Sequence, residues 1–217
     1  MKIKNVIFDL DGTLIDSAQS IISSIKFAFE KAKVLPAQPL TLELIGPPLG
    51  EIISNLVTDS DIQASAEIIK NFKFYYDEYG YRETKVYEGI SEMLTELRQM
   101  NLNLFIATNK RILPTVKIVE YVGWSSIFDE LYALDYFVPL LPNKEVMLRR
   151  VMQDIGGSND SAIYIGDRAE DAEAAGNSRL PFLWAAWGYG NSSFFQASDF
   201  VLTKPSQLPF ILTHNSF

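Results

Sequence analysis

Short apolar runs alternate with amphipathic helical patterns along most of the chain. The runs of strand length lie at residues 3–8, 102–108, 130–136, 161–167 and 180–186. After Gly89, apolar residues also recur at helical spacing, and this predicts helices over about 89–100, 112–122, 143–155 and 169–176. Such alternation predicts a parallel sheet with helices on both faces. The nearly all-apolar strands agree, because parallel strands are buried on both sides.

A helical block interrupts this alternation near the N-terminus. The pattern from Ser17 to Lys33 places apolar residues on one helix face, with Asp16 or Ser17 as the expected N-cap. The segment 40–80 shows helical patterns and no strand-like alternation. We therefore expect residues 16–85 to form an inserted α-helical cap domain. The sheet domain would then comprise residues 1–15 and 86–217.

The predicted fold class is thus α/β, a Rossmann-like doubly wound parallel sheet core with a small inserted α-helical cap. A length of 217 residues, with 47% hydrophobic and 21% charged residues, suits one globular domain that carries a smaller insert. The net charge of -8 argues against nucleic acid as a partner, because that affinity rests on Lys and Arg contacts to phosphates. No apolar run is long enough to span a membrane, and none reads as a secretory signal, so we expect a cytoplasmic protein.

The composition also restricts the chemistry. The chain has no cysteine, which excludes disulfides, thiolate nucleophiles and Cys-ligated metals. Its only histidine is His214, close to the C-terminus, so a Ser-His-Asp triad would depend on one tail residue. Carboxylates, hydroxyls, lysines and a hard metal ion remain as the chemical groups to consider.

Polar side chains follow several of the predicted strands. The first strand leads into Asp9 and Asp11, the second into Thr108 and its two neighbours, and a later one into Asp167. Ligands of open α/β sheets bind at the carboxyl ends of the strands, so these residues are expected to meet at one edge. Clustered carboxylates suit Mg²⁺, whereas a hydroxyl, a lysine such as Lys144 and helix N-termini suit a phosphate. The pattern predicts phosphoryl transfer.

The motifs "DLDGTLIDS", "ATNK" and "IGDRAEDAEAA", with a lysine before a helix, resemble the haloacid dehalogenase-like (HAD) superfamily. The similarity spans nearly the whole chain and is greatest to the phosphoglycolate-phosphatase-like branch. It implies a Mg²⁺-dependent phosphomonoester hydrolase that acts on a small phosphorylated metabolite through an aspartyl-phosphate. The inserted helices resemble the cap of that branch, and the loop "GPPLG" (46–50) is expected to face the core.

The resemblance also implies roles for the four aspartates. Asp9 would be the nucleophile. Asp11 would be the general acid that protonates the leaving alcohol and then the base that activates water. Mg²⁺ would be held by the Asp9 carboxylate, the Asp11 backbone carbonyl and Asp167. Asp171 would act on the metal through water or from behind its ligands.

The remaining motif residues are implied to bind the phosphate. Thr108 and the backbone N–H of Asn109 would hold phosphate oxygens, and Lys144 would neutralise charge on the nucleophile and the phosphate. Lys144 lacks the proline that usually follows this lysine, so Lys110 stays open as an alternative. The role of Arg168, which replaces a small hydroxyl residue of the family motif, is also open.

Other activities of the same scaffold were weighed against this one. A phosphosugar mutase keeps the same core and differs in its cap. A haloacid dehalogenase needs neither Asp11 nor Asp167, and a phosphonate hydrolase needs a cap amine such as Lys70 or Lys73. A non-catalytic phosphate-binding or interaction protein would be expected to lack Asp9 or Asp11. The identity of the substrate, the cap residues that bind it, and a monomeric or homodimeric state are left undecided.

Overall fold

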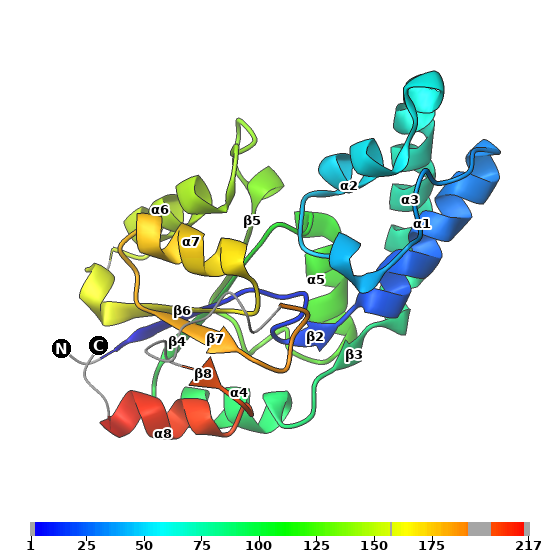
Figure 1. Cartoon of the computed structure of the whole chain (residues 1–217). Helices are drawn as coiled ribbons and strands as arrows, with labels where there is room; N and C mark the ends of the chain where they lie inside the picture. Colours follow the sequence, from blue (N-terminus) through cyan, green and yellow to red (C-terminus); the bar gives the residue numbers. More distant parts are fainter. Residues whose placement is uncertain (1–2, 157, 191–200, 215–217) are drawn as a thin grey trace.

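The computed structural model describes residues 3–156, 158–190 and 201–214. Residues 1–2, 157, 191–200 and 215–217, which belong to the predicted sheet domain, lie outside the described part of the chain. A central sheet lies between two layers of helices, and a third group of helices stands beside the sheet (Figure 1). No helix in the described part of the chain is both long and apolar enough to cross a membrane.

Within the described residues the sheet has six strands in the order β5-β4-β1-β6-β7-β8, and every neighbouring pair is parallel. In chain order the strands are β1 (Asn5–Phe8), β4 (Asn103–Thr108), β5 (Glu130–Ala133), β6 (Ala162–Gly166), β7 (Phe182–Ala185) and β8 (Val201–Leu202). The order reverses at β1, which is the doubly wound arrangement that creates a crevice at the carboxyl ends of the central strands. The predicted fold class is confirmed.

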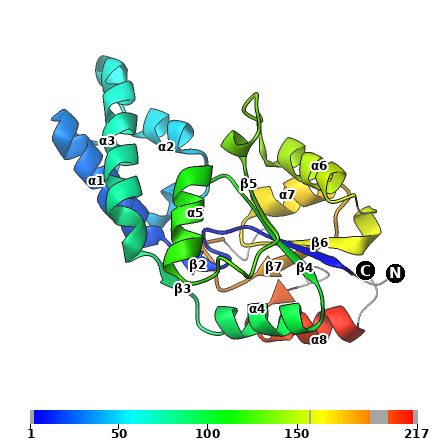
Figure 2. The ribbon, with the colours of Figure 1, turned by 180° about the vertical axis from the view of Figure 1, so that it is seen from behind.

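Helices cover both faces of this sheet (Figures 1 and 2). One face carries α4 (Ile90–Gln99), α5 (Ile112–Tyr121) and α8 (Gln207–His214), and the other carries α6 (Lys144–Asp154) and α7 (Ala169–Asn177). Alternate residues of β1 point to opposite faces of the sheet. Val6 and Phe8 belong to the core on the side of α4, α5 and α8, and Ile7 belongs to the core on the side of α6 and α7. The strands are buried from both sides, as their apolar sequences predict.

The inserted helices pack mainly on one another. They are α1 (Ala18–Ala32), α2 (Leu49–Leu56) and α3 (Ser65–Glu78), joined by the short 3-10 helices η1 (Leu42–Leu44), η2 (Asp59–Ala64) and η3 (Gly80–Glu83). The chain leaves the sheet domain through β2 (Ile15–Asp16) and returns through β3 (Lys85–Val86), and these two strands pair antiparallel. Helix α3 also lies beside α5 (Figure 2). The insert therefore contacts the sheet domain close to the end of β4.

The predicted elements recur with shifts of one to a few residues. The main difference is the run 130–136, in which only Glu130–Ala133 is a strand and Leu134–Tyr136 continues as the 3-10 helix η4. The sequence pattern did not show β2, β3, β8 or α8, which are short. Helix α1 begins as expected, with Ser17 at the N-cap position. The residue before it, Asp16, provides the side-chain bond at this end, since its Oδ1 accepts from the Ala18 N–H at 3.1 Å. The Ser17 hydroxyl makes no capping bond and is used elsewhere.

The turn after β1 depends on Gly12, whose φ of +87° favours glycine. A Cβ at this position would overlap the buried Asp167 carboxylate, which the Tyr189 N–H holds in place. We expect Gly12→Ala to destabilise the protein by about 2–4 kcal/mol through backbone strain and overpacking. Thermal unfolding would measure this. Gly50→Ala is the matched control, since a Cβ there meets nothing within 4 Å. Equal stability of the two variants would contradict the expectation.

Candidate active site

The reversal of strand order brings three functional segments to the same edge. Asp9 directly follows β1, and its N–H donates to the Ile165 carbonyl of β6 at 2.8 Å. Asp167 follows β6, and Thr108 ends β4 on the other side of β1. All three side chains are buried. The structure thus brings these predicted site residues together, and the parallel register of the three central strands is the reason.

Three carboxylates form a compact cluster at this edge. Asp9, Asp167 and Asp171 each offer one oxygen, and these oxygens lie within 4.8 Å of one another. Asp171 comes from the first turn of α7 and is held by the backbone N–H groups of Asp167 and Arg168, which donate to its Oδ2 at 3.2 and 3.0 Å. Buried carboxylates repel one another unless a cation lies among them. The donor set is the one that a hard divalent cation such as Mg²⁺ prefers.

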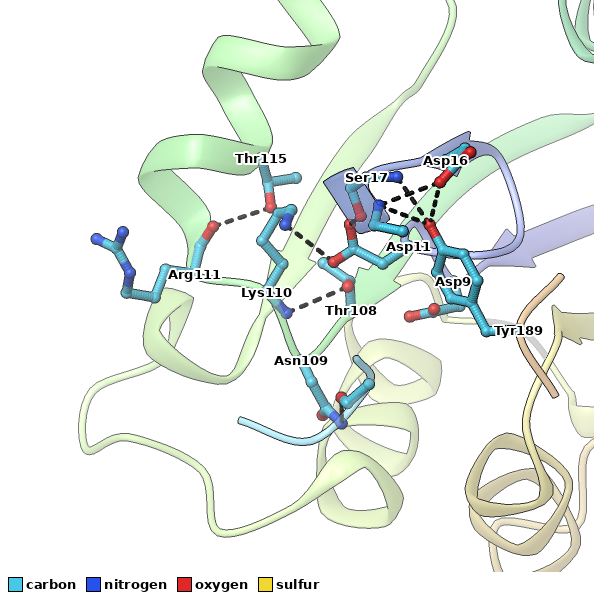
Figure 3. A network of polar contacts seen from close by, with 12 residues as sticks. Asp9, Asp11, Asp16, Ser17, Thr108, Asn109, Lys110, Arg111, Thr115 and Tyr189 are labelled. Carbon is cyan, nitrogen blue, oxygen red and sulfur yellow. Dashed lines mark hydrogen bonds and ion pairs between the residues drawn. The ribbon is translucent and has the colours of Figure 1, made fainter. Parts of the chain in front are cut away.

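The Asp167 carboxylate is oriented by groups from two separate segments. The Thr13 hydroxyl donates to its Oδ1 at 3.2 Å, and the Tyr189 N–H donates to its Oδ2 at 2.8 Å. The Tyr189 hydroxyl donates to Asp16 Oδ1 at 2.8 Å and accepts from the Ser17 N–H at 2.8 Å (Figure 3). Tyr189 therefore connects the carboxylate cluster to the segment where the chain enters α1.

Lys144 is the cation that faces this cluster. Its Nζ lies 2.9 Å from Asp9 Oδ1 and also contacts Asp171 Oδ1. Burial alone would lower the pKa of Lys144, but Asp171 and Asp9 outweigh this effect and raise it well above its ordinary value. Lys144 is positioned by the start of α6, where the Asn143 side chain caps the helix by accepting from the Val146 N–H at 2.9 Å. A charged lysine is thus held against the proposed nucleophile.

Lys110 pairs with the other aspartate of the first motif. Its Nζ lies 3.0 Å from Asp11 Oδ2, and both side chains are largely buried. The second oxygen of Asp11 accepts a short hydrogen bond from the Ser17 hydroxyl (Figure 3). The two lysines therefore do not compete for one position, because Lys144 faces Asp9 and Lys110 faces Asp11.

The end of β4 provides polar groups beside Asp9. Thr108 is buried, and its Oγ1 accepts from the Lys110 N–H at 3.2 Å. The Asn109 side chain donates to the Gly46 carbonyl of the cap loop at 3.3 Å, while its buried Oδ1 has no hydrogen-bond partner among the described residues. The Arg168 side chain lies against Gly46 of this loop and donates to the Leu42 carbonyl of η1 at 3.4 Å. The loop 46–50 faces the core, as expected from the sequence.

Two cavities meet at Asp9. The smaller, of about 70 Å³, lies between the core and the cap; it is lined by Asp11, Lys110 and Arg111 from the core and by apolar cap residues. The larger, of about 340 Å³, extends past Lys144 and Arg168. Asp11 lines only the smaller one. A group that approaches the Asp11 carboxylate through these cavities therefore enters the smaller one.

Burial makes the metal-free cluster sensitive to pH. Burial raises the pKa of Asp9 to about 6, against the lowering effect of Lys144. It raises the pKa of Asp167 to about 8, and the neighbouring Asp171 and Asp9 add to the increase. Between the ordinary value of 3.8 and these raised values, the folded state holds protons that the unfolded state has lost. The protonation of these two carboxyl groups therefore contributes most to the unfolding free energy at low pH. This contribution is lost as pH rises through that window.

We expect the unfolding free energy of the protein in EDTA to fall as pH rises from about 5 to about 8, by a few kcal/mol in order of magnitude. Mg²⁺ should restore more stability at pH 8 than at pH 6, because it replaces protons as the compensating charge. Thermal unfolding at each pH measures both effects. Asp167→Asn should flatten the dependence, and an unchanged profile in that variant would contradict the assignment.

Sequence reasoning missed the groups that surround the motif residues. Asp11 accepts a hydrogen bond from Ser17, and Asp167 accepts from Thr13 and Tyr189. None of these three donors was selected as a site residue. For Tyr189 the sequence offers one signal, the aromatic and glycine-rich segment "WGYG" (187–190). Tyr76 was not selected either, although Lys110 Nζ lies 4.6 Å from the centre of its ring.

Comparison with known proteins identifies the family of this chain. The family described as haloacid dehalogenase-like hydrolase matches residues 6–185. The phosphoglycolate phosphatase of Aquifex aeolicus is 28% identical over 204 residues, covering 94% of this chain and 93% of that protein. The tyrosine-protein kinase PtkA of Mycobacterium tuberculosis is 27% identical over 205 residues, covering 94% of this chain and 69% of that protein.

A solved structure of a predicted phosphatase from Clostridium acetobutylicum superposes with a TM-score of 0.85 at 27% identity. The alignment covers 99% of this chain and 100% of that one. The family match, the phosphoglycolate phosphatase relative and this shared fold together identify the class of the protein. The chain belongs to the haloacid dehalogenase-like hydrolases and is, within that family, a phosphatase of the branch that resembles phosphoglycolate phosphatases.

Proposed function

We propose that this protein is a Mg²⁺-dependent phosphomonoester hydrolase that forms an aspartyl-phosphate on Asp9 and acts on a small phosphorylated metabolite. The observation that carries the proposal is the pairing of two aspartates on one turn with two different buried lysines. Asp9 has Lys144 at 2.9 Å, and Asp11 has Lys110 at 3.0 Å. Two neighbouring carboxylates in separate electrostatic settings suit two different chemical roles.

Asp9 is placed to attack phosphorus. Its carboxylate and an incoming phosphate are both anionic, so attack requires positive charge beside them. Lys144 supplies one such charge. Mg²⁺ would be held by the Asp9 carboxylate, the Asp11 carbonyl and Asp167, and it would supply the second by neutralising phosphate oxygens. Asp171, whose oxygens already accept from four donors, would support the metal site from behind.

The proton transfers fall to Asp11. In the first step the Asp9 oxygen bonds to phosphorus, the bond to the leaving oxygen breaks, and Asp11 gives its proton to that oxygen to complete the alcohol. In the second step Asp11 takes a proton from the water that attacks the aspartyl-phosphate. Phosphate leaves and Asp9 is regenerated. Covalent catalysis of this kind divides one difficult displacement into two easier ones.

The phosphate and the alcohol would occupy different parts of the site. Thr108 and the Asn109 N–H would bind phosphate oxygens beside Asp9, in keeping with their place at the end of β4. The alcohol would enter the cavity of about 70 Å³ that Asp11 lines, with walls formed by residues 16–85 acting as the cap. That volume suits a small leaving group, since drug-sized ligands require several hundred Å³.

Release of inorganic phosphate from a panel of phosphomonoesters, with Mg²⁺ and with EDTA, tests the proposal. The panel should include phosphoglycolate, sugar phosphates, nucleoside monophosphates and p-nitrophenyl phosphate. Metal-dependent release, fastest for esters of small alcohols, is the expected result. Isomerisation of a sugar phosphate without release would indicate a mutase instead. A folded protein that turns over none of these esters would refute the proposal.

A further inference from the structure

We propose that Lys110 is a positioning residue for the acid–base carboxylate Asp11, and that the cap holds Lys110 in place through the ring of Tyr76. This inference rests on the proposed function, which gives Asp11 the proton-transfer role. The family motif requires one lysine, and Lys144 occupies that position against Asp9. Lys110 is a second buried lysine that the proposed mechanism does not yet use.

Lys110 and Ser17 fix the rotation of the Asp11 carboxyl group. Lys110 Nζ faces Oδ2 at 3.0 Å, and the Ser17 hydroxyl faces Oδ1 (Figure 3). An ammonium group has three donors and no lone pair, so the oxygen that faces Lys110 cannot carry a proton. A hydroxyl can both donate and accept. The proton that Asp11 delivers is therefore confined to Oδ1, and the carboxyl group cannot turn over without losing its ion pair.

The cap determines where the Lys110 ammonium lies. Its Nζ lies between the Asp11 carboxylate and the face of Tyr76, 4.6 Å from the ring centre. Tyr76 is buried in α3 and stacked on Phe72, with ring centres 5.3 Å apart. The attraction of a cation to an aromatic face, in a site from which water is excluded, adds to the ion pair. Tyr76 thus lies against Lys110 in the wall of the small cavity.

A second contact between the core and the cap lies next to the one between Lys110 and Tyr76. Arg111 binds Asp77 of α3 with both terminal nitrogens, one at 2.9 Å from Oδ2 and the other against Oδ1. A bidentate arginine–carboxylate pair fixes geometry as well as adding energy. Residues 110–111 of the core are therefore held in a fixed position against residues 76–77 of the cap. Because Thr108 is only two residues away, the same short segment contacts the phosphate site, the acid–base carboxylate and the cap.

This role predicts a dependence on the leaving group. A correctly oriented acid matters most when the departing oxygen is basic, as in an alkyl phosphate, and least when the anion is stable, as with p-nitrophenolate. The ratio kcat/KM isolates the steps up to departure of the leaving group. We expect Lys110→Met to lower kcat/KM about 100-fold for the best alkyl phosphate of the panel and less than about fivefold for p-nitrophenyl phosphate. Substituted phenyl phosphates should fall between these limits, in order of the basicity of the phenolate.

Two further comparisons separate positioning from structure. Tyr76→Leu removes the ring and should reproduce part of the selective loss, whereas Tyr76→Phe retains the ring and should not. Lys117→Met is the matched control, because Lys117 is another core lysine at the cap, which donates to the Asp77 carbonyl at 2.6 Å and does not contact Asp11. Any decrease in kcat/KM that Lys117→Met causes should be the same for every leaving group.

The outcomes are distinct. A loss in Lys110→Met that is equal for all esters would overturn the inference, and so would a loss that follows the charge of the leaving group instead of its basicity. If Lys110→Met does not fold, Tyr76→Leu compared with Tyr76→Phe decides the question by the same criterion. Failure of the wild-type protein to hydrolyse any ester would instead refute the proposed function itself.

Discussion

Asp9→Asn is expected to abolish metal-dependent release of phosphate, with kcat at least about 10³-fold below that of the wild type. The substitution keeps the size of the side chain and removes the anionic nucleophile. It also removes one carboxylate of the metal cluster, so Mg²⁺ should bind more weakly. Steady-state release of phosphate measures the first effect, and titration of Mg²⁺ by the shift in thermal unfolding measures the second.

The matched control for this variant is Asp16→Asn. Asp16 lies on the same segment, accepts from Tyr189 and from the start of α1, and has no place in the carboxylate cluster. An asparagine can still accept these bonds, so activity within about tenfold of the wild type is expected. Rapid quenching with radiolabelled substrate should trap phosphate on the wild-type chain and not on Asp9→Asn. Full turnover by Asp9→Asn would rule out the aspartyl-phosphate.

Lys144→Met is expected to have the second-largest effect. Its ammonium is the one that contacts both Asp9 and Asp171, so the variant leaves buried carboxylates without their compensating cation. We expect kcat to fall about 10²–10³-fold, since a preorganised charge at the transition state is lost. We also expect the metal-free protein to lose about 3–5 kcal/mol of stability, and saturating Mg²⁺ to restore part of it.

Comparison with Lys110→Met settles which lysine belongs to the nucleophile. Lys144→Met should reduce turnover of every ester, p-nitrophenyl phosphate included, because phosphorus is attacked in each of them. Lys110→Met should spare the activated ester. The opposite result would be a loss of turnover limited to alkyl esters in Lys144→Met and an equal loss for all esters in Lys110→Met. It would assign Lys110 to the nucleophile and Lys144 to the acid–base residue.

The strand-end residues were predictable because sheet topology fixes where they meet. Asp9, Thr108 and Asp167 follow apolar runs, and the carboxyl ends of neighbouring parallel strands share one edge whatever the details of packing. The doubly wound order of the strands followed from the alternation of strands and helices. These inferences needed only local patterns along the chain.

The partners of these residues could not be predicted in the same way. That Lys110 faces Asp11 depends on how α3 of the insert lies against the segment that enters α5, and that Lys144 faces Asp9 depends on where α6 begins beside the sheet. No local pattern encodes either arrangement. The same holds for Tyr189, which reaches Asp167 from a distant loop. In the run 130–136 the pattern was mostly apolar, and the strand ends early because the chain turns into η4.

The antiparallel pair β2 and β3 has a consequence for how such proteins diversify. Ile15 lies opposite Val86 and Asp16 opposite Lys85, so the chain leaves and re-enters the sheet domain at adjacent points. An insert of any length can join these points without moving Asp9 before them or Thr108 after them. Grafting a foreign insert between Asp16 and Lys85 would thus exchange the alcohol that is released and preserve the attack on phosphorus. Three demands remain on the graft: it must keep a hydroxyl at the Ser17 position for Asp11, present an aromatic face to Lys110, and present a carboxylate to Arg111.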